Sequence, residues 1–220
     1  RGSNNRSDHS ESAVFTHSSP VELEIDGDSV VAGEGVGTLD INMQNYPGCQ
    51  NFCFDPKENE VSFNCFENGE YDNGMDEFGN IGYCFGEDRC MDAEGEWYKF
   101  VREDEVDETE CSEFQGTWFD GYVGGFQIEF LGITIDDATA PDGFTVSTSP
   151  TTVLGFSLSG ATIPVGEGIL TQVSFTSFNG ESICFGDDTG SAGNNVISDT
   201  TGIEIETDWG DCYCDPSNPE

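Results

Sequence analysis

The sequence predicts an all-β protein, an antiparallel β-sandwich of about nine strands that carries a disulfide-rich, loop-dominated insertion. Apolar residues alternate with polar ones in short runs, and Gly, Pro and Asn-Gly signals separate the runs. No segment sustains the 3.6-residue period of an amphipathic helix. Six of the nine cysteines fall between residues 49 and 111, in an acidic stretch that interrupts the alternation. Such a cysteine density is typical of a disulfide scaffold.

The expected strands begin at Val21 and end at Ile205. Turn signals such as Pro141-Asp142-Gly143 and Asn179-Gly180 separate them. We therefore expect residues 20–47 and 123–214 to form one sandwich domain. In chain order, the apolar residues of the runs are Val21, Leu23 and Ile25; Leu39, Ile41 and Met43; Phe126, Ile128 and Phe130; Ile133 and Ile135; Phe144 and Val146; Phe156 and Leu158; Ile169 to Phe175; Ile183 and Phe185; Val196 and Ile197; and Ile203 and Ile205.

Residues 48–122 form the insertion. They hold 21 of the 44 acidic residues and four of the six basic ones. Because they contain too few aliphatic residues for a core of their own, we expect disulfides to hold them. A short helix is expected between Glu103 and Glu113, and residues 1–19 and 215–220 are expected to be tails.

The cysteines favour disulfides over a zinc site. The spacing Cys49-x3-Cys53 is not CxxC, and the two histidines, His9 and His17, both lie in the N-terminal tail. Cys212 and Cys214 lie on the same side of an extended strand and are too close in sequence to pair easily, so one of them should pair with Cys184. The insertion cysteines should pair among themselves; they are Cys49, Cys53, Cys65, Cys84, Cys90 and Cys111.

The formal net charge of −38 excludes the partners that are themselves polyanions. Phosphate backbones and anionic membrane surfaces would be repelled over a Debye length of about 10 Å. No apolar run approaches the roughly 18 residues that cross a bilayer. The acidity predicts either a salt-adapted, solvated surface or a source of calcium ligands.

Calcium is the expected cofactor if the acidic runs bind anything, because it takes six to eight oxygen ligands. Two runs combine carboxylates with glycines, one in the insertion and one in a late loop, and neither has the EF-hand spacing. A solvated acidic loop is the alternative for each run. The candidate ligands are Glu70, Asp72, Asp76 and Glu77 in the first run, and Asp187 and Asp188 in the second.

Several sandwich segments are similar to a known kind of domain. The stretch Val123-Gly-Gly-Phe-Gln-Ile-Glu-Phe-Leu-Gly132, followed by Thr152-Val-Leu-Gly-Phe-Ser157 and Gly166-Glu-Gly-Ile-Leu-Thr171, resembles the cohesin-like or carbohydrate-binding-module-like β-sandwich of secreted proteins. Gly37-Thr-Leu-Asp-Ile-Asn-Met43 matches the strand that precedes the first of these. The resemblance covers about half of the chain and implies binding of proteins or polysaccharides without catalysis. The insertion departs from it.

Catalysis is not expected, and no catalytic residue is assigned. A nucleophilic triad needs a histidine base, and both histidines lie in the tail. A glycosidase needs two carboxylates, but none stands out among 44. A glycan would need an aromatic platform, for which the candidates are Trp97, Tyr98, Trp118 and Tyr122. The alternative for these side chains is the insertion's own core.

The sequence therefore predicts a non-enzymatic, extracellular structural protein, a self-assembling surface or filament subunit. The odd number of cysteines leaves one thiol for a contact outside the chain. Ala13, Val14 and Phe15 are expected to form an assembly arm on a neighbouring copy, and Asn5 is the only glycosylation sequon. The absence of an apolar leader before Arg1 predicts a mature secreted chain. The first alternative is a carbohydrate- or protein-binding module, and the second is a secreted hydrolase.

Overall fold

The computed structural model describes residues 15–16, 18–33, 35–54, 66–67, 70–71, 90, 96–178, 181–186 and 195–215. The chain divides into two compact units. The sandwich unit comprises residues 19–48 and 119–220, and the insertion unit comprises residues 1–18 and 49–118. The insertion bounds differ by a few residues from the expected 48–122. The grouping of residues 1–18 with the insertion differs from the separate tail that the sequence predicted.

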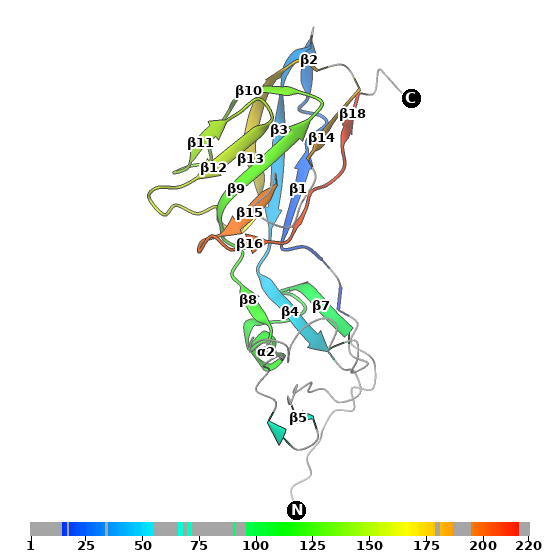
Figure 1. Cartoon of the computed structure of the whole chain (residues 1–220), viewed down its shortest axis with the longest axis vertical. Helices are drawn as coiled ribbons and strands as arrows, with labels where there is room; N and C mark the ends of the chain where they lie inside the picture. The colour runs from blue at the N-terminus through cyan, green and yellow to red at the C-terminus, as the bar shows by residue number, and fades with distance from the viewer. Residues whose placement is uncertain are drawn as a thin grey trace, which may run out of the picture. The chain divides into compact units, whose positions relative to one another are not determined.

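The first sheet of the sandwich unit has six strands in the order β10-β13-β3-β1-β17, with β2 paired to β3 (Figure 1). Neighbouring strands are antiparallel except β1 and β17, which are parallel. The parallel pair is a local departure from the antiparallel expectation. The strands are β1 (Val21–Ile25), β2 (Val31–Gly33), β3 (Val36–Asn45), β10 (Thr134–Ala138), β13 (Gly166–Thr176) and β17 (Thr207–Asp208).

The second sheet has seven strands in the order β11-β12-β9-β14-β18, and β15 pairs with both β9 and β16. Its strands are β9 (Val123–Leu131), β11 (Thr145–Thr148), β12 (Thr152–Phe156), β14 (Ser182–Phe185), β15 (Val196–Asp199), β16 (Glu204–Ile205) and β18 (Tyr213–Cys214). Of these thirteen strands in the two sheets, four (β2, β16, β17 and β18) have three residues or fewer. The nine longer ones match the predicted number.

Alternation places the core between the two sheets. On β1, Val21, Leu23 and Ile25 are buried while Glu22 and Glu24 point outward. On β9, Phe126, Ile128 and Phe130 are buried in the same way. The predicted all-β sandwich is therefore confirmed, because one apolar face per sheet is what the period-two pattern encodes.

One predicted strand is displaced. The run of Phe156 and Leu158 was expected within a strand, but β12 ends at Phe156 and Leu158 is 87% exposed. The Ser157 hydroxyl donates to the Gly143 carbonyl at 3.1 Å and accepts the Ala161 N–H at 2.8 Å. These bonds turn the chain before Leu158 can join the sheet.

The insertion unit has more regular structure than the loop-dominated segment that we expected. Its three-stranded sheet has the order β7-β4-β8 and is formed by β4 (Gly48–Phe54), β7 (Glu96–Arg102) and β8 (Thr117–Phe119). A separate pair is formed by β5 (Phe66–Glu67) and β6 (Glu70–Tyr71).

The helix α2 (Glu108–Glu113) of the insertion unit begins later than the expected start at Glu103. Asp107 caps it: the carboxylate accepts the N–H groups of Thr109 at 2.8 Å and Glu110 at 2.9 Å. The Glu110 carboxylate accepts the Asp107 N–H in return, which completes a capping box and sets the first turn. Within the described ranges, no helix is long and apolar enough to cross a bilayer.

The insertion unit also has a small core, which corrects the expectation that disulfides alone hold it. Three of the seven residues in this buried cluster are aromatic: the set is Cys49, Phe52, Phe54, Tyr98, Val101, Val106 and Cys111. Phe52 stacks on Tyr98 with ring centroids 5.3 Å apart. Aromatic side chains bury more area per residue than aliphatic ones, so a few of them can form a buried cluster here.

Candidate binding faces of the sandwich unit

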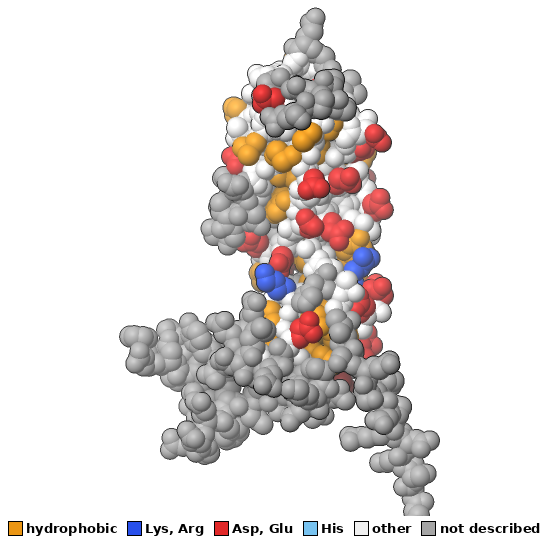
Figure 2. All heavy atoms as spheres, turned by 90° about the vertical axis from the view of Figure 1, so that its right-hand side faces the viewer, with side chains coloured by type: hydrophobic (Ala, Val, Ile, Leu, Met, Phe, Trp, Pro, Cys, Tyr) orange, Lys and Arg blue, Asp and Glu red, His pale blue; other side chains and the backbone are white. Residues whose placement is uncertain are grey.

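The two sheets of the sandwich unit present outer faces of opposite character. Figure 2 shows one side of the molecule, where acidic side chains far outnumber basic ones on the described surface. Carboxylates and amides line the outer face of β17, β1, β3 and β13, whereas the outer face of β12, β9 and β15 contains a hollow with no charged side chain. Each face is a candidate binding site.

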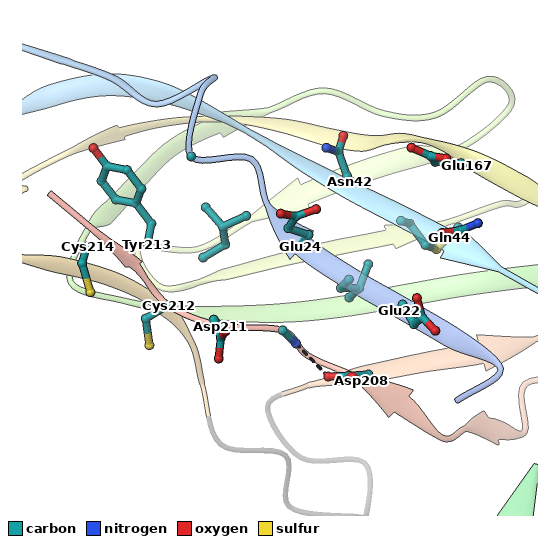
Figure 3. Close-up of a pocket in the computed structure, with 15 residues that line it drawn as sticks. Glu22, Glu24, Asn42, Gln44, Glu167, Asp208, Asp211, Cys212, Tyr213 and Cys214 are labelled. Atoms are coloured by element: carbon teal, nitrogen blue, oxygen red, sulfur yellow. Dashed lines mark hydrogen bonds between the residues drawn. The ribbon is translucent and has the colours of Figure 1, made fainter. Parts of the chain in front are cut away.

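The acidic groove is the larger hollow, with a volume of about 550 Å³. Figure 3 shows Glu22 and Glu24 on β1, Asn42 and Gln44 on β3, and Glu167 on β13 along one surface. The strand register explains this arrangement, because Glu22 lies opposite Gln44 and Gln44 lies opposite Glu167.

The carboxylates of the acidic groove are spread along the sheet face. At its edge, the Asp208 carboxylate accepts the Gly210 N–H at 3.0 Å (Figure 3). Among the described residues, no three His, Cys, Asp or Glu side chains come together closely enough to hold a metal ion. The groove is a negatively charged sheet face.

The neutral groove has a volume of about 310 Å³ and lies over β12, β9 and β15. Leu154, Gln127 and Val196 are cross-strand neighbours in one row. Phe156, Gly125 and Ser198 form the next row. The ten lining residues, none of them charged, are Gly124, Gly125, Phe126, Gln127, Leu154, Gly155, Phe156, Ser157, Val196 and Ser198.

Glycines create this hollow. Gly125 points outward between Phe156 and Ser198, so that no side chain fills the centre of its row. Gly155 faces the core, where an added Cβ would overlap the ring of Phe126. An added Cβ at Gly124 would overlap the backbone carbonyl of Asp199. The glycine pair in β9 and Gly155 in β12 therefore let strands and rings approach more closely than any other residue would.

Three disulfides lie among the described residues. Cys49 pairs with Cys111 and Cys53 with Cys90, as expected for pairing within the insertion. Cys184 pairs with Cys212, one of the two partners that the spacing allowed, and Cys214 is an exposed free thiol. Cys65 and Cys84 lie outside the described residues.

The predicted calcium ligands and the sequon cannot be located. Asp72, Asp76, Glu77, Asp187, Asp188 and Asn5 lie outside the described residues, and only the backbone of Glu70 is described, in β6. Calcium binding and glycosylation at these positions stay predictions. For calcium, the check is a melting curve with and without excess chelator, in which a lower midpoint on chelation is expected.

The four residues of the predicted glycan platform do not form one. Tyr98 is completely buried, so the prediction is wrong for this residue. Trp118 packs against the insertion core, Trp97 is half-buried, and Tyr122, 41% exposed, belongs to the sandwich unit. Of the four candidates, Tyr98 and Trp118 contribute to the insertion core, which was the alternative interpretation.

Phe15 packs against its own chain. Its ring is half-buried against Phe52, Phe54, Tyr98 and Phe114, at centroid distances of 6.0, 5.1, 5.3 and 6.3 Å. The Thr16 N–H donates to the Glu105 carboxylate at 2.8 Å. The exposure of Phe15, which was the reason to expect an inter-subunit arm, is therefore not observed. Ala13 and Val14 lie outside the described residues, and the arm stays a prediction.

Comparison with known proteins gives structural matches only. No family model matches the chain, and no curated protein matches it. One similar structure is the solution structure of CaCohA2 from Clostridium acetobutylicum, with 11% identity and a TM-score of 0.38 over 89% of this chain and 90% of that chain. Another is a type II cohesin domain from the cellulosome of Acetivibrio cellulolyticus, with 13% identity and a TM-score of 0.37 over 89% and 93%. The second is of the kind that the sequence resembles. With TM-scores below 0.5, these matches carry no functional conclusion.

Proposed function

We propose that this chain is a non-enzymatic, extracellular protein-binding module that associates with further copies of itself through the neutral groove. The observation that carries the proposal is the absence of charge from all ten residues that line the groove, on a chain with a formal charge of −38. The extracellular assignment is supported by the three disulfides, which persist in oxidising compartments.

Electrostatics favours this face for contact between copies. Two chains of −38 repel each other, and any contact through the acidic groove would also bury carboxylates, at a cost of several kcal/mol per ion. The neutral groove can be covered without burying a carboxylate. Because salt screens the remaining repulsion over about 10 Å, self-association should strengthen as ionic strength rises.

The groove also supplies apolar surface. Leu154 is 39% exposed, and Phe156 and Val196 are half-buried beside it. Covering an exposed Leu, Val or Phe side chain fully is worth roughly 1.5–3 kcal/mol, so these three partly exposed ones contribute a few kcal/mol at most. One such contact is weak by itself, which suits a subunit held in an assembly by several contacts.

The experiment compares two Leu→Glu variants that carry the same added charge. Leu154→Glu places a carboxylate in the groove, whereas Leu158→Glu places one at an 87% exposed position outside it. Sedimentation velocity from low to seawater-like salt should show salt-dependent association of the native chain and of Leu158→Glu, but not of Leu154→Glu. Images of the same samples would show whether the assembly is a filament.

Two outcomes contradict the proposal. A native chain that stays monomeric at all salt and protein concentrations would leave a different protein as the occupant of the groove. Equal association of the two variants would place the contact elsewhere. The carbohydrate-binding alternative loses one of its candidate platform residues, because Tyr98 is buried in the insertion core.

A further inference from the structure

We propose that the insertion unit contains a binding site for a detachable aromatic arm, and that in the assembled protein Phe15 of a second copy occupies it. The site, called the arm pocket here, consists of Phe52, Phe54, Tyr98 and Phe114. In the monomer, the chain's own Phe15 fills it. The inference deepens the proposed self-association by adding a second contact, and it rests on that proposal only in taking the partner to be a copy of the chain.

The arm pocket is built to receive a ring. Phe52 and Tyr98 are fully buried and stack on each other, and Phe52 also stacks on Phe114 with centroids 5.4 Å apart. Phe15 meets Phe52, Phe54 and Tyr98 edge-on, at interplanar angles of 65, 74 and 77°. Edge-to-face contacts of this kind are a preferred arrangement of aromatic pairs. Phe15 itself is only half-buried, so it lies at the mouth of the arm pocket.

The arm is lightly held. The described residues between 15 and 20 belong to no strand or helix. Besides the ring contacts, the Thr16 N–H donates to the Glu105 carboxylate and the Phe15 backbone bonds to the Tyr98 hydroxyl, and both bonds attach the arm to the insertion unit. Its other end is fixed in the sandwich unit, where the Pro20 carbonyl accepts the Tyr46 N–H at 2.9 Å. The ring can therefore leave the arm pocket without breaking a strand pairing.

A second copy is the occupant that the observations favour. An arm from a neighbour makes the same ring contacts and the same bond to Glu105 as the chain's own arm, so exchange replaces each contact with an identical one. Residues 10–20 contain one carboxylate, Glu11, in a chain that has 44 acidic residues. This segment can therefore approach an acidic neighbour with less repulsion than most of the surface.

The test is complementation between two variants, both made with Leu154→Glu so that the neutral groove cannot contribute. Phe15→Ala has an arm pocket but no ring to fill it, and Phe114→Ala has the ring but a damaged pocket. Neither should form a dimer alone. Mixed at equal concentration, with one chain isotope-labelled, they should form a heterodimer that native mass spectrometry resolves. The control mixes Phe114→Ala with Phe178→Ala, a substitution at a half-buried ring of the sandwich unit. The Phe178→Ala chain keeps its own Phe15 in the arm pocket, so no heterodimer should form.

A second measurement tests the arm pocket itself. A synthetic peptide of residues 10–20 should change the fluorescence of Trp118, which packs against this cluster, when added to the full-length Phe15→Ala chain. The Phe15→Ala peptide should bind at least tenfold more weakly. Failure of the peptide to bind would overturn the arm pocket. Binding of the peptide without formation of a heterodimer would contradict occupation of the arm pocket by a second copy. Neither result affects the neutral groove, whose salt-dependent association is tested separately by Leu154→Glu.

Discussion

The two units of this chain are stabilised in different ways. The sandwich unit has a large core of mainly aliphatic and Phe side chains that comes from both sheets, from Val21 on β1 to Ile205 on β16. Among its described residues, the insertion unit has a core cluster of seven buried residues, two of them joined by the Cys49–Cys111 disulfide. A core that small supplies little free energy against the entropy of folding, so cross-links have to supply much of the rest.

This difference shows how an acidic, cysteine-rich insertion can be accommodated. The sandwich folds on period-two alternation, which needs no cysteine. The insertion starts in β4, the central strand of its small sheet, and ends in β8, which pairs with one side of β4 while β7 pairs with the other. We therefore expect the two units to respond differently to perturbation, and each prediction below tests that expectation.

The largest effect should come from removing the Cys49–Cys111 disulfide. It joins residues 62 apart, and the entropy of closing such a loop in the unfolded chain is worth about 4 kcal/mol. The Cys49→Ala/Cys111→Ala chain should lose hydrogen-exchange protection throughout β4 and β7 while the sandwich strands keep theirs.

The matched control is Cys184→Ala/Cys212→Ala, which removes the disulfide of the sandwich unit. It joins residues 28 apart, worth about 3.5 kcal/mol by the same estimate. The sandwich should melt at a lower temperature but remain folded. Unfolding of the sandwich in either double variant would contradict the difference between the two units. Full hydrogen-exchange protection of the insertion in Cys49→Ala/Cys111→Ala would contradict it as well.

An overpacked sandwich core should give the next largest effect. Gly155→Ala would drive a Cβ into the ring of Phe126, which should cost about 1–3 kcal/mol and lower the melting temperature of the sandwich unit alone. Gly168→Ala is the matched control, because an added Cβ there has nothing within 4 Å. Its effect should stay within about 0.5 kcal/mol. Equal losses of stability in the two variants would show that the contact of Gly155 with the Phe126 ring does not require a glycine in β12.

Alkaline pH should affect the insertion unit through Tyr98. Burial, followed by the hydrogen bond and charge of Glu96, raises the pKa of Tyr98 from 10.0 to about 12. Its contribution to stability is therefore fully present below pH 10 and is lost as pH rises toward 12. Tyr98→Phe should move the alkaline loss of insertion near-UV circular dichroism to higher pH. Tyr122→Phe, at an exposed ring of the sandwich unit, should leave it unchanged.

The smallest effect should be an acid-dependent one in the sandwich unit. Burial opposes ionisation of Asp199, but hydrogen bonds from Ile203 N–H and from the Thr201 N–H and hydroxyl outweigh it and lower its pKa below 3.8. The stability it contributes is present above about pH 3.8 and is lost as pH falls below that value. Asp199→Asn should cost about 1 kcal/mol or less near neutral pH.

The pH dependence of stability isolates the contribution of the Asp199 charge. Thermal melts from pH 6 to 2.5 should converge for the native chain and Asp199→Asn as the native carboxylate becomes protonated. Asp136→Asn, at an exposed position of the other sheet, is the control and should follow the native curve. A constant gap between the native chain and Asp199→Asn over the whole range would show that the carboxylate charge contributes nothing.

Much of the sandwich could be predicted because its signal is local. Val21, Leu23 and Ile25 alternate with Glu22 and Glu24, and this pattern alone assigns the inner and outer faces of β1. Polar residues that become buried carry no such signal. Asn45 is buried and donates to the carbonyls of Gly121 and Pro164, and its neighbours in sequence do not distinguish it from an exposed residue.

The candidate sites were predicted less well, because they depend on which strands lie side by side. Gln127, Leu154 and Val196 form one row of the neutral groove, although β9, β12 and β15 are far apart in the sequence. The residues proposed for a glycan platform were chosen because they are aromatic, and residue type alone does not show which side chains are buried. The sequence did contain one signal for the groove. Gly124 and Gly125 in β9 and Gly155 in β12 interrupt two strands whose other positions carry side chains.

The sequence by itself determined the all-β class, the position of the insertion, the strong negative charge and the choice of disulfides for its cysteines, since each follows from composition or from local periodicity. The tertiary structure decided that Cys184 pairs with Cys212 and not Cys214, that Phe15 fills a pocket of the insertion, and that a groove free of charged side chains lies over β12, β9 and β15. These features depend on contacts between residues distant in sequence, and such contacts are fixed only when strand order and register are fixed.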